Sequence, residues 1–235
     1  YICGIAHDVI GEFFSNKVIV PGITTSSDVV WWIRQRFTDL GLKTWFQPSV
    51  DIQRTEQIAM KYKSDPDVIR RGDVLHCDIG ITYLGLNTDT QEMAYVLHEN
   101  ESEVPEGLKE ALRRANRVQD IFMGEFIEGS TGNEILLRSL DKARLEGLNA
   151  SIYTHPIGFN GHAAGPTIGL WDKQEAIPGK GDYPLYDNTA YSIELNNIYN
   201  VPEWDGQEVR IPLEEDAVFS DDVCTFLDGK IGRAH

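Results

Sequence analysis

Two aspartates in neighbouring predicted strands are the first residues in the sequence that could do chemistry together. Asp78 and Asp89 lie eleven residues apart, in segments 74–81 and 88–97, which the residue pattern predicts to be the two strands of a hairpin. The turn is expected near Leu84 and Gly85. If the strands pair symmetrically about Tyr83 and Leu84, residues whose numbers sum to 167 face each other, and the two aspartates meet that sum. Two bare carboxylates in that position repel each other, and burial increases the cost, so a cation between them would remove the penalty. The alternative is that both are solvent-facing acids on a half-exposed sheet.

Two histidines flank a glycine-rich loop later in the chain. His155 and His162 are seven residues apart in HPIGFNGH (residues 155–162). Imidazole is both a common metal ligand and a proton carrier near neutral pH, whereas the ordinary alternative is a loop histidine bonded to the backbone. The other histidines carry no clear signal; they are His7, His76, His98 and His235.

Two glutamates occupy the last two strands that we expect, residues 189–197 and 208–220. Glu194 shares one predicted strand face with Ser192 and Asn196, and its ordinary alternative is a solvated residue on a polar face. Glu214 precedes Glu215, and the local pattern does not decide which of the two points toward a site.

Together these residues are two Asp, two Glu and one His. Such a set suits a pair of divalent ions such as Mn, Co, Fe or Zn, and four carboxylates balance the charge of two dications. A water molecule between two such ions becomes a nucleophile at neutral pH.

The elements that must position these residues are mixed. Apolar spacing predicts helices over residues 1–16, 27–40, 105–128 and 134–147. The helix at 27–40 follows the cap-rich run TTSSD (residues 24–28). A further strand is expected over 45–50, and the polar segment 51–72 is expected to be a loop. Because strands and helices do not alternate regularly, the order favours an α+β fold with an antiparallel sheet.

Composition limits the class of protein. The 235 residues carry 21 basic and 37 acidic side chains, a net charge of −16, which argues against a nucleic-acid or anionic-membrane partner. The three cysteines are far apart and form no disulfide framework. No apolar run approaches the length of a membrane span. The cytoplasm is the default expectation for localisation.

In these motifs the chain resembles the pita-bread metallopeptidases: methionine aminopeptidases, Xaa-Pro aminopeptidases and prolidases. The matching segments are IVPGIT (19–24), RGDVLHCDIG (71–80), the strand with Asp89, HPIG (155–158), SIE (192–194) and LEED (213–216). The resemblance implies a curved antiparallel sheet flanked by helices, a peptide substrate, and two divalent ions, with manganese favoured. It also implies that residues 1–235 are a single catalytic domain that lacks the start of its first helix and any N-terminal domain. A homodimer is the candidate assembly.

The resemblance also assigns roles. It makes Asp78, Asp89, His155, Glu194 and Glu214 the five metal ligands, with Asp89 and Glu214 shared between the ions. Glu194 matches the family's general base. His162 matches the histidine that contacts the scissile peptide and steadies the tetrahedral intermediate without binding metal.

Departures from the family pattern concern the rim of the site. Residues 48–53 contain no counterpart of the family's histidine near the substrate N-terminus, and Ala163 stands where a glutamate usually follows His162. Proline-specific members often have a histidine where this chain has Ser151 and an arginine where it has Pro212.

Segment 51–73 resembles the Xaa-Pro branch more than the methionine branch, so we expect an Xaa-Pro aminopeptidase or dipeptidase. A methionine aminopeptidase is the alternative within the family. A catalytically inactive scaffold on the same fold, or a metal-independent hydrolase like the creatinase branch, is the alternative outside peptidases, but both typically lack the full ligand set.

Overall fold

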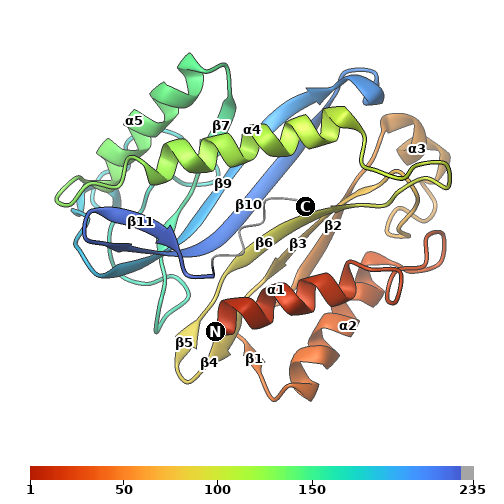
Figure 1. Ribbon diagram of the computed structural model, residues 1–235, viewed down its shortest axis with the longest axis horizontal. Helices are drawn as coiled ribbons and strands as arrows, with labels where there is room; N and C mark the ends of the chain where they lie inside the picture. Colours follow the sequence, from red (N-terminus) through yellow and green to blue (C-terminus); the bar gives the residue numbers. More distant parts are fainter. Residues whose placement is uncertain (229–235) are drawn as a thin grey trace.

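The computed structural model describes residues 1–228 and contains one large antiparallel sheet (Figure 1). Its order is β2-β3-β6-β10-β9-β7, with β11 paired to β10 and β8 paired to β9. These strands are β2 (Ser49–Gln53), β3 (Val74–Ile79), β6 (Thr90–Tyr95), β7 (Asn149–Ile152), β8 (His155–Pro156), β9 (Thr189–Val201), β10 (Gln207–Ser220) and β11 (Val223–Phe226). A second small sheet holds β1 (Lys43–Thr44), β4 (Ile81–Tyr83) and β5 (Leu86–Asn87). The expected α+β class with an antiparallel sheet is confirmed.

Five α-helices accompany the sheets within the described part of the chain. They are α1 (Ile2–Phe13), α2 (Ser26–Asp39), α3 (Glu56–Lys61), α4 (Glu106–Met123) and α5 (Gly132–Leu145). The cap-rich run before α2 acts as predicted, because Thr25 and Asp28 form a capping box. Thr131 and Glu134 form another at the start of α5. Two 3₁₀ turns, η1 (Lys180–Asp182) and η2 (Pro202–Trp204), complete the elements. No helix of residues 1–228 is both long and apolar enough to span a membrane.

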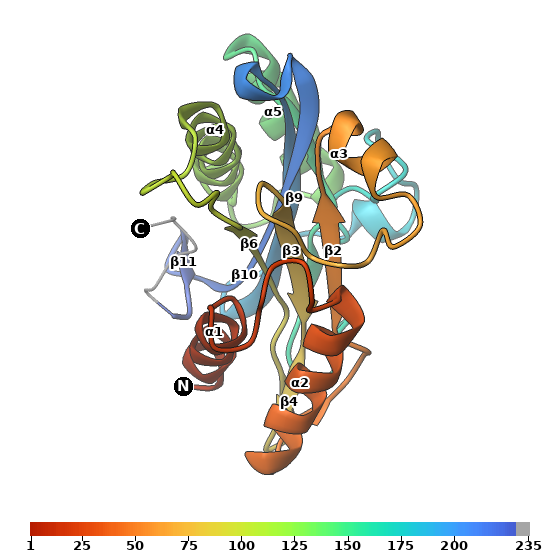
Figure 2. The same cartoon turned by 90° about the vertical axis from the view of Figure 1, so that its right-hand side faces the viewer.

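The hydrophobic core lies between one face of the large sheet and the helices. The apolar stripe of α4, including Ala111, Ala115 and Phe122, packs with β9 and β10 residues such as Ile193 and Ile211. A second cluster joins α1 and α2 to the inner residues of β3, Leu75, Cys77 and Ile79. Viewed along the sheet, α1 and α4 lie on one side, and α3 with the cyan segment after β7 lies on the other (Figure 2). The alternate residues of each strand therefore face away from α1 and α4.

The predicted hairpin is present, but its register differs from the expected one. Asp78 pairs with Gln91, so facing residues sum to 169 and not to 167. The turn consists of Leu84 and Gly85, both with positive φ, which is the backbone of the tight two-residue hairpin turn. The expected place of the turn, near Leu84 and Gly85, is therefore confirmed, and the error lies in centring the pairing one residue too early, on Tyr83 and Leu84. The shift is two residues, so Asp78 and Asp89 still share a sheet face, although they are not directly opposite.

The segment expected to be a loop contains two regular elements. β2 covers residues 49–53 and pairs with β3, and α3 follows at 56–61. The strand expected at 45–50 is also wrong at residues 45–48, which join β1 to β2. Short polar strands at a sheet edge carry weak local patterns, and pairing with a central strand decides them.

Candidate metal centre

A row of polar side chains crosses four neighbouring strands on the face opposite α1 and α4. In register, Asp78 of β3 faces Gln91 of β6, Gln91 faces Glu214 of β10, and Glu214 faces Glu194 of β9. Asp89, two residues before Gln91, points to the same side. Antiparallel pairing therefore collects residues that lie more than 130 positions apart in the chain.

His155 enters this row from β8. Its Nε2 lies 3.6 Å from Asp89 Oδ2 and 3.7 Å from Glu214 Oε1. Its Nδ1 lies 3.1 Å from the carbonyl oxygen of Pro156. When Nδ1 carries the proton and donates it to that carbonyl, the Nε2 lone pair faces the two carboxylates, which is how metal-binding imidazoles are commonly oriented. Asp89, His155 and Glu214 offer ligand atoms that all lie within 4.8 Å of one another.

The ionisation of the cluster reflects crowded buried carboxylates. Burial raises the pKa of Asp78 to about 8, and the Glu214 carboxylate adds to the rise. Burial, together with Glu214, likewise raises the pKa of Glu194 to about 9. Burial also raises the pKa of Asp89. Burial alone would lower the pKa of His155, but the facing Asp89 and Glu214 carboxylates raise it to about 10.

The donor set fits divalent ions. Oδ1 of Asp78 is buried and has no hydrogen-bond partner, which is costly for a carboxylate oxygen unless another ligand satisfies it. Four carboxylates and one imidazole around one buried space also require positive charge to be ionised together. Hard and borderline divalent ions prefer such oxygen-rich sets.

His162 lies beside this cluster without joining it. Its ring centre is 4.4 Å from that of His155 and 5.4 Å from that of Trp45. The Trp45 indole packs so closely on Gly161 that an added Cβ there would lie 2.4 Å from the ring. Trp45 Nε1 donates to the carbonyl of Thr88 at 2.8 Å, so one tryptophan links the histidine loop to the start of β6. Burial, with His155 nearby, lowers the pKa of His162.

Gln91 is a site residue that the sequence reasoning missed. Its Nε2 donates to Glu194 Oε1 at 2.7 Å and to Glu214 Oε2 at 2.5 Å. Its Oε1 lies 2.8 Å from Nε2 of His76. A signal was available, because strand alternation places residue 91 on the face of Asp89.

The choice between Glu214 and Glu215 is settled by their faces. Glu214 joins the row, whereas Glu215 points toward α1, where its Oε2 lies 2.9 Å from Nε2 of His7. Glu92 Oε1 lies 4.0 Å from the same nitrogen, and Asp228 Oδ2 lies 2.9 Å from Nδ1. Burial would lower the pKa of His7, but hydrogen bonding to Glu215 raises it to about 9. His7 therefore serves as the cation of a separate acidic cluster, while His235 lies outside the described residues.

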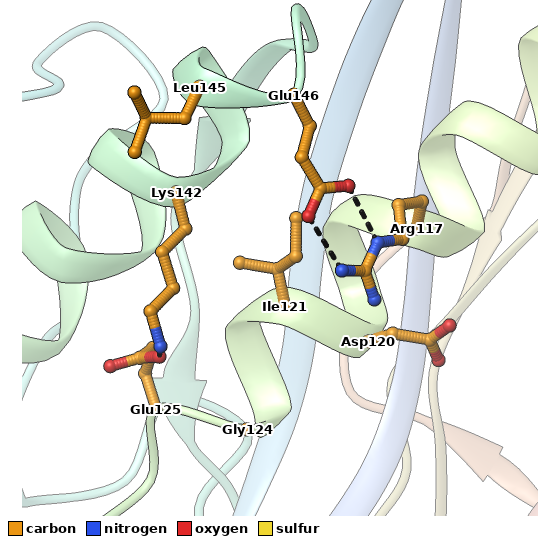
Figure 3. Close-up of a pocket in the computed structure, with 8 residues that line it drawn as sticks. All are labelled: Arg117, Asp120, Ile121, Gly124, Glu125, Lys142, Leu145 and Glu146. Carbon is orange, nitrogen blue, oxygen red and sulfur yellow. Dashed lines mark hydrogen bonds and ion pairs between the residues drawn. The ribbon is translucent and has the colours of Figure 1, made fainter.

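A cleft of about 1390 Å³ opens above the row. Its walls include the side chains of Asp78, His155, His162 and Glu194, and it extends along the sheet to Tyr153 and Arg210. A smaller hollow of about 320 Å³ lies between α4 and α5 (Figure 3). There Arg117 pairs with Glu146 and Lys142 with Glu125, so its basic groups are already neutralised. The larger cleft is the candidate substrate site.

Solved structures with the same fold include several peptidases. An X-Pro aminopeptidase from Thermotoga maritima matches with a TM-score of 0.72 and 21% identity, covering 99% of this chain and 60% of that one. A dipeptidase from Pyrococcus horikoshii matches with a TM-score of 0.68 and 19% identity over 96% and 57%. A methionine aminopeptidase from Thermotoga maritima matches with a TM-score of 0.64 and 20% identity over 93% and 90%. The chain thus spans about 60% of the length of the first two proteins.

These neighbours share the pita-bread architecture that the sequence motifs predicted. A search among curated proteins finds no match. A sequence model of metallopeptidase family M24, in contrast, matches residues 1–223. Because that match extends over nearly the whole chain, and the fold agrees with it, the protein belongs to metallopeptidase family M24.

Proposed function

We propose that this chain carries the catalytic site of a dinuclear metal-dependent peptidase that hydrolyses the N-terminal peptide bond of peptides, with Xaa-Pro aminopeptidase or dipeptidase specificity. The observation that carries the proposal is the joining of five potential ligands: Asp78, His155 and Glu194 line one cleft, and Asp89 and Glu214 lie against His155. Membership of a peptidase family and the orphaned Asp78 oxygen support it. We also propose that residues 1–235 act as one catalytic domain.

Within this proposal the five residues divide the work of holding two ions. Asp89 and Glu214 would contribute to holding both ions, Asp78 would help to hold one, and His155 with Glu194 would help to hold the other. Divalent ions held there would polarise the substrate carbonyl and lower the pKa of water. Manganese is the favoured metal, with cobalt, zinc and iron as alternatives.

The chain's own groups bind the substrate and move protons. Glu194, at the end of the row, accepts the proton released by the attacking water. His162 lies at the rim beside His155 and donates a hydrogen bond to the carbonyl oxygen that becomes negatively charged. The lowered pKa of His162 keeps one ring nitrogen as a neutral donor near pH 7.

Metal analysis and a peptide panel test the proposal together. The purified protein should hold close to two divalent ions per chain, lose activity on exhaustive chelation, and cleave Xaa-Pro peptides faster than peptides that begin with methionine. Preference for methionine would transfer the assignment to the methionine branch. Full metal loading without hydrolysis of any peptide would favour the scaffold reading, and activity that survives chelation would exclude the metal mechanism.

A further inference from the structure

Arg210 is a cation in the acidic cleft without an acidic partner. It lies on β10 four residues before Glu214, on the same strand face, and lines the cleft. The hydrogen bond of its guanidinium runs from Nη2 to the hydroxyl of Tyr153 at 3.1 Å. No carboxylate of residues 1–228 forms an ion pair with it, although the chain carries 37 acidic side chains. Other arginines, such as Arg36, Arg54 and Arg117, are paired with carboxylates.

The position of Arg210 is fixed by its neighbours. Gln53 of β2 accepts from the Arg210 amide at 3.0 Å and donates to its carbonyl at 2.7 Å. Tyr153 is held in turn, since its amide donates to the carbonyl of Glu194 at 3.1 Å. The guanidinium is therefore tied to the strand that carries Glu194, and its remaining N–H groups are available to a ligand in the cleft.

The distance along β10 between Arg210 and Glu214 determines how long a ligand must be to reach both the guanidinium and the acidic row. Four residues of β-strand span about 13 Å, so Arg210 and Glu214 are separated by about the length of four extended peptide residues. The guanidinium contacts the Tyr153 hydroxyl, which lies by Asn196, the partner of Pro212. It therefore extends from Arg210 toward the row. A peptide whose N-terminal bond lies over the acidic row would thus bring its C-terminus to Arg210 after about two or three further residues.

We propose that Arg210 binds the C-terminal carboxylate of short peptide substrates, so that the substrate class is free peptides of about three or four residues. The inference rests on the proposed function for the position of the scissile bond. A guanidinium matches a carboxylate with two parallel hydrogen bonds. A blocked or distant C-terminus would forfeit this interaction. Lys180 of η1 also lines the cleft, but Arg210 is the basic residue that lies on the same strand as Glu214, in line with the acidic row.

The test compares peptides that differ only in the terminal group. Binding of Ala-Pro-Ala and of its C-terminal amide to the manganese-loaded protein is measured by calorimetry, and hydrolysis is measured in parallel. The free acid should bind about 10- to 100-fold more tightly than the amide, as expected for hydrogen bonds to charged groups. In Arg210→Met this ratio should fall to about one, and Arg210→Lys should restore part of it.

Arg34→Met is the matched control. Arg34 stacks over the Trp31 ring on α2, outside the cleft, so its loss should leave the acid-to-amide ratio unchanged. Equal binding of acid and amide by the wild-type protein, or an unchanged ratio in Arg210→Met, would overturn the inference. Arg210-dependent preference for the acid without any hydrolysis would uphold the carboxylate site and reject the peptidase function, so the two failures are distinguishable.

Discussion

Glu194 is the single residue to which the proposal gives two tasks, binding an ion and accepting a proton. Glu194→Gln keeps the shape and one carbonyl oxygen but removes the charge and the basic site. Turnover should therefore fall by about 100- to 10,000-fold, the range for loss of a general base. Steady-state kinetics at saturating manganese measures the effect, and Glu208→Gln, an exposed position on β10, is the control. A Glu194→Gln enzyme within a few-fold of wild type would reject the assignment.

The two loop histidines should behave differently when each is replaced by alanine. His155→Ala removes the imidazole that faces Asp89 and Glu214, so bound metal should decrease. His162→Ala should leave metal content near two ions and lower the catalytic constant by about 100- to 1,000-fold, as for loss of an oxyanion donor. Metal stoichiometry and kinetics on both variants decide the matter. Equal metal loss in both would show that the two roles are assigned wrongly.

At the scale of elements, β6 supports two proposed ligands that lie on its neighbours β9 and β10. Gln91 bonds Glu194 and Glu214 at once and is itself bonded to His76, so it fixes the separation of two carboxylates on neighbouring strands. Gln91→Leu should weaken metal binding by about 10- to 100-fold, the usual cost of removing a group that orients metal ligands. Calorimetric titration with manganese measures this affinity directly, without reference to activity.

Two further variants make the test of Gln91 specific. Gln35→Leu removes an exposed glutamine on α2 that bonds Asp39 and should leave metal affinity unchanged. Gln91→Asn keeps an amide but shortens it by one methylene, so it should also bind metal weakly while remaining polar. Wild-type affinity in both Gln91 variants, with folding verified by circular dichroism, would mean that the two glutamates need no support from β6.

At the scale of the whole molecule, the metal should contribute to stability. An ion that binds only the folded state adds about 2.7 kcal/mol at a concentration 100-fold above its dissociation constant. For a chain of this size that corresponds to a rise of about 5–10 °C in melting temperature. Thermal unfolding with manganese and with chelator measures the difference, and an identical melting temperature in both conditions would contradict a built metal site.

The pH dependence of stability should differ between the metal-free and metal-loaded protein. Asp78 and Glu194 have folded-state pKa values raised to about 8 and about 9 by burial, above the values near 4 expected in the unfolded chain. The folded state therefore holds their protons more tightly, and the stability they provide is complete below about pH 4 and is lost as the pH rises through 8 to 9. Melting temperatures in chelator should fall between pH 5 and pH 9.

Manganese should remove most of the fall in melting temperature between pH 5 and pH 9, because the bound cations replace the protons on Asp78 and Glu194. In chelator, Asp78→Asn should also flatten the curve, since its amide does not titrate. If the melting temperature of the wild-type protein depended on pH in the same way with and without manganese, these carboxylates would not share their site with cations.

Local pattern by itself determined the four longer helices, α1, α2, α4 and α5, and the faces of the strands. The period-two alternation placed Asp78 and Asp89 on one face even though the expected hairpin register was two residues wrong, because a shift of two residues preserves the face. The capping residues Thr25 and Asp28 fixed the start of α2 through short-range hydrogen bonds. Such features depend on neighbours within a few residues, so the sequence alone specifies them.

Contacts between distant segments were decided only by the tertiary structure. The hairpin register depends on Leu84 adopting a positive φ, which the pairing of β4 with β5 imposes against the local preference of leucine. Glu214 and Glu215 are adjacent acids, and the pairing of β10 with β9 and β6 sends one to the cleft and the other to His7 on α1. Gln91 and Arg210 acquire their importance from partners on other strands, because hydrogen bonds across a sheet join residues whose separation in the chain carries no signal.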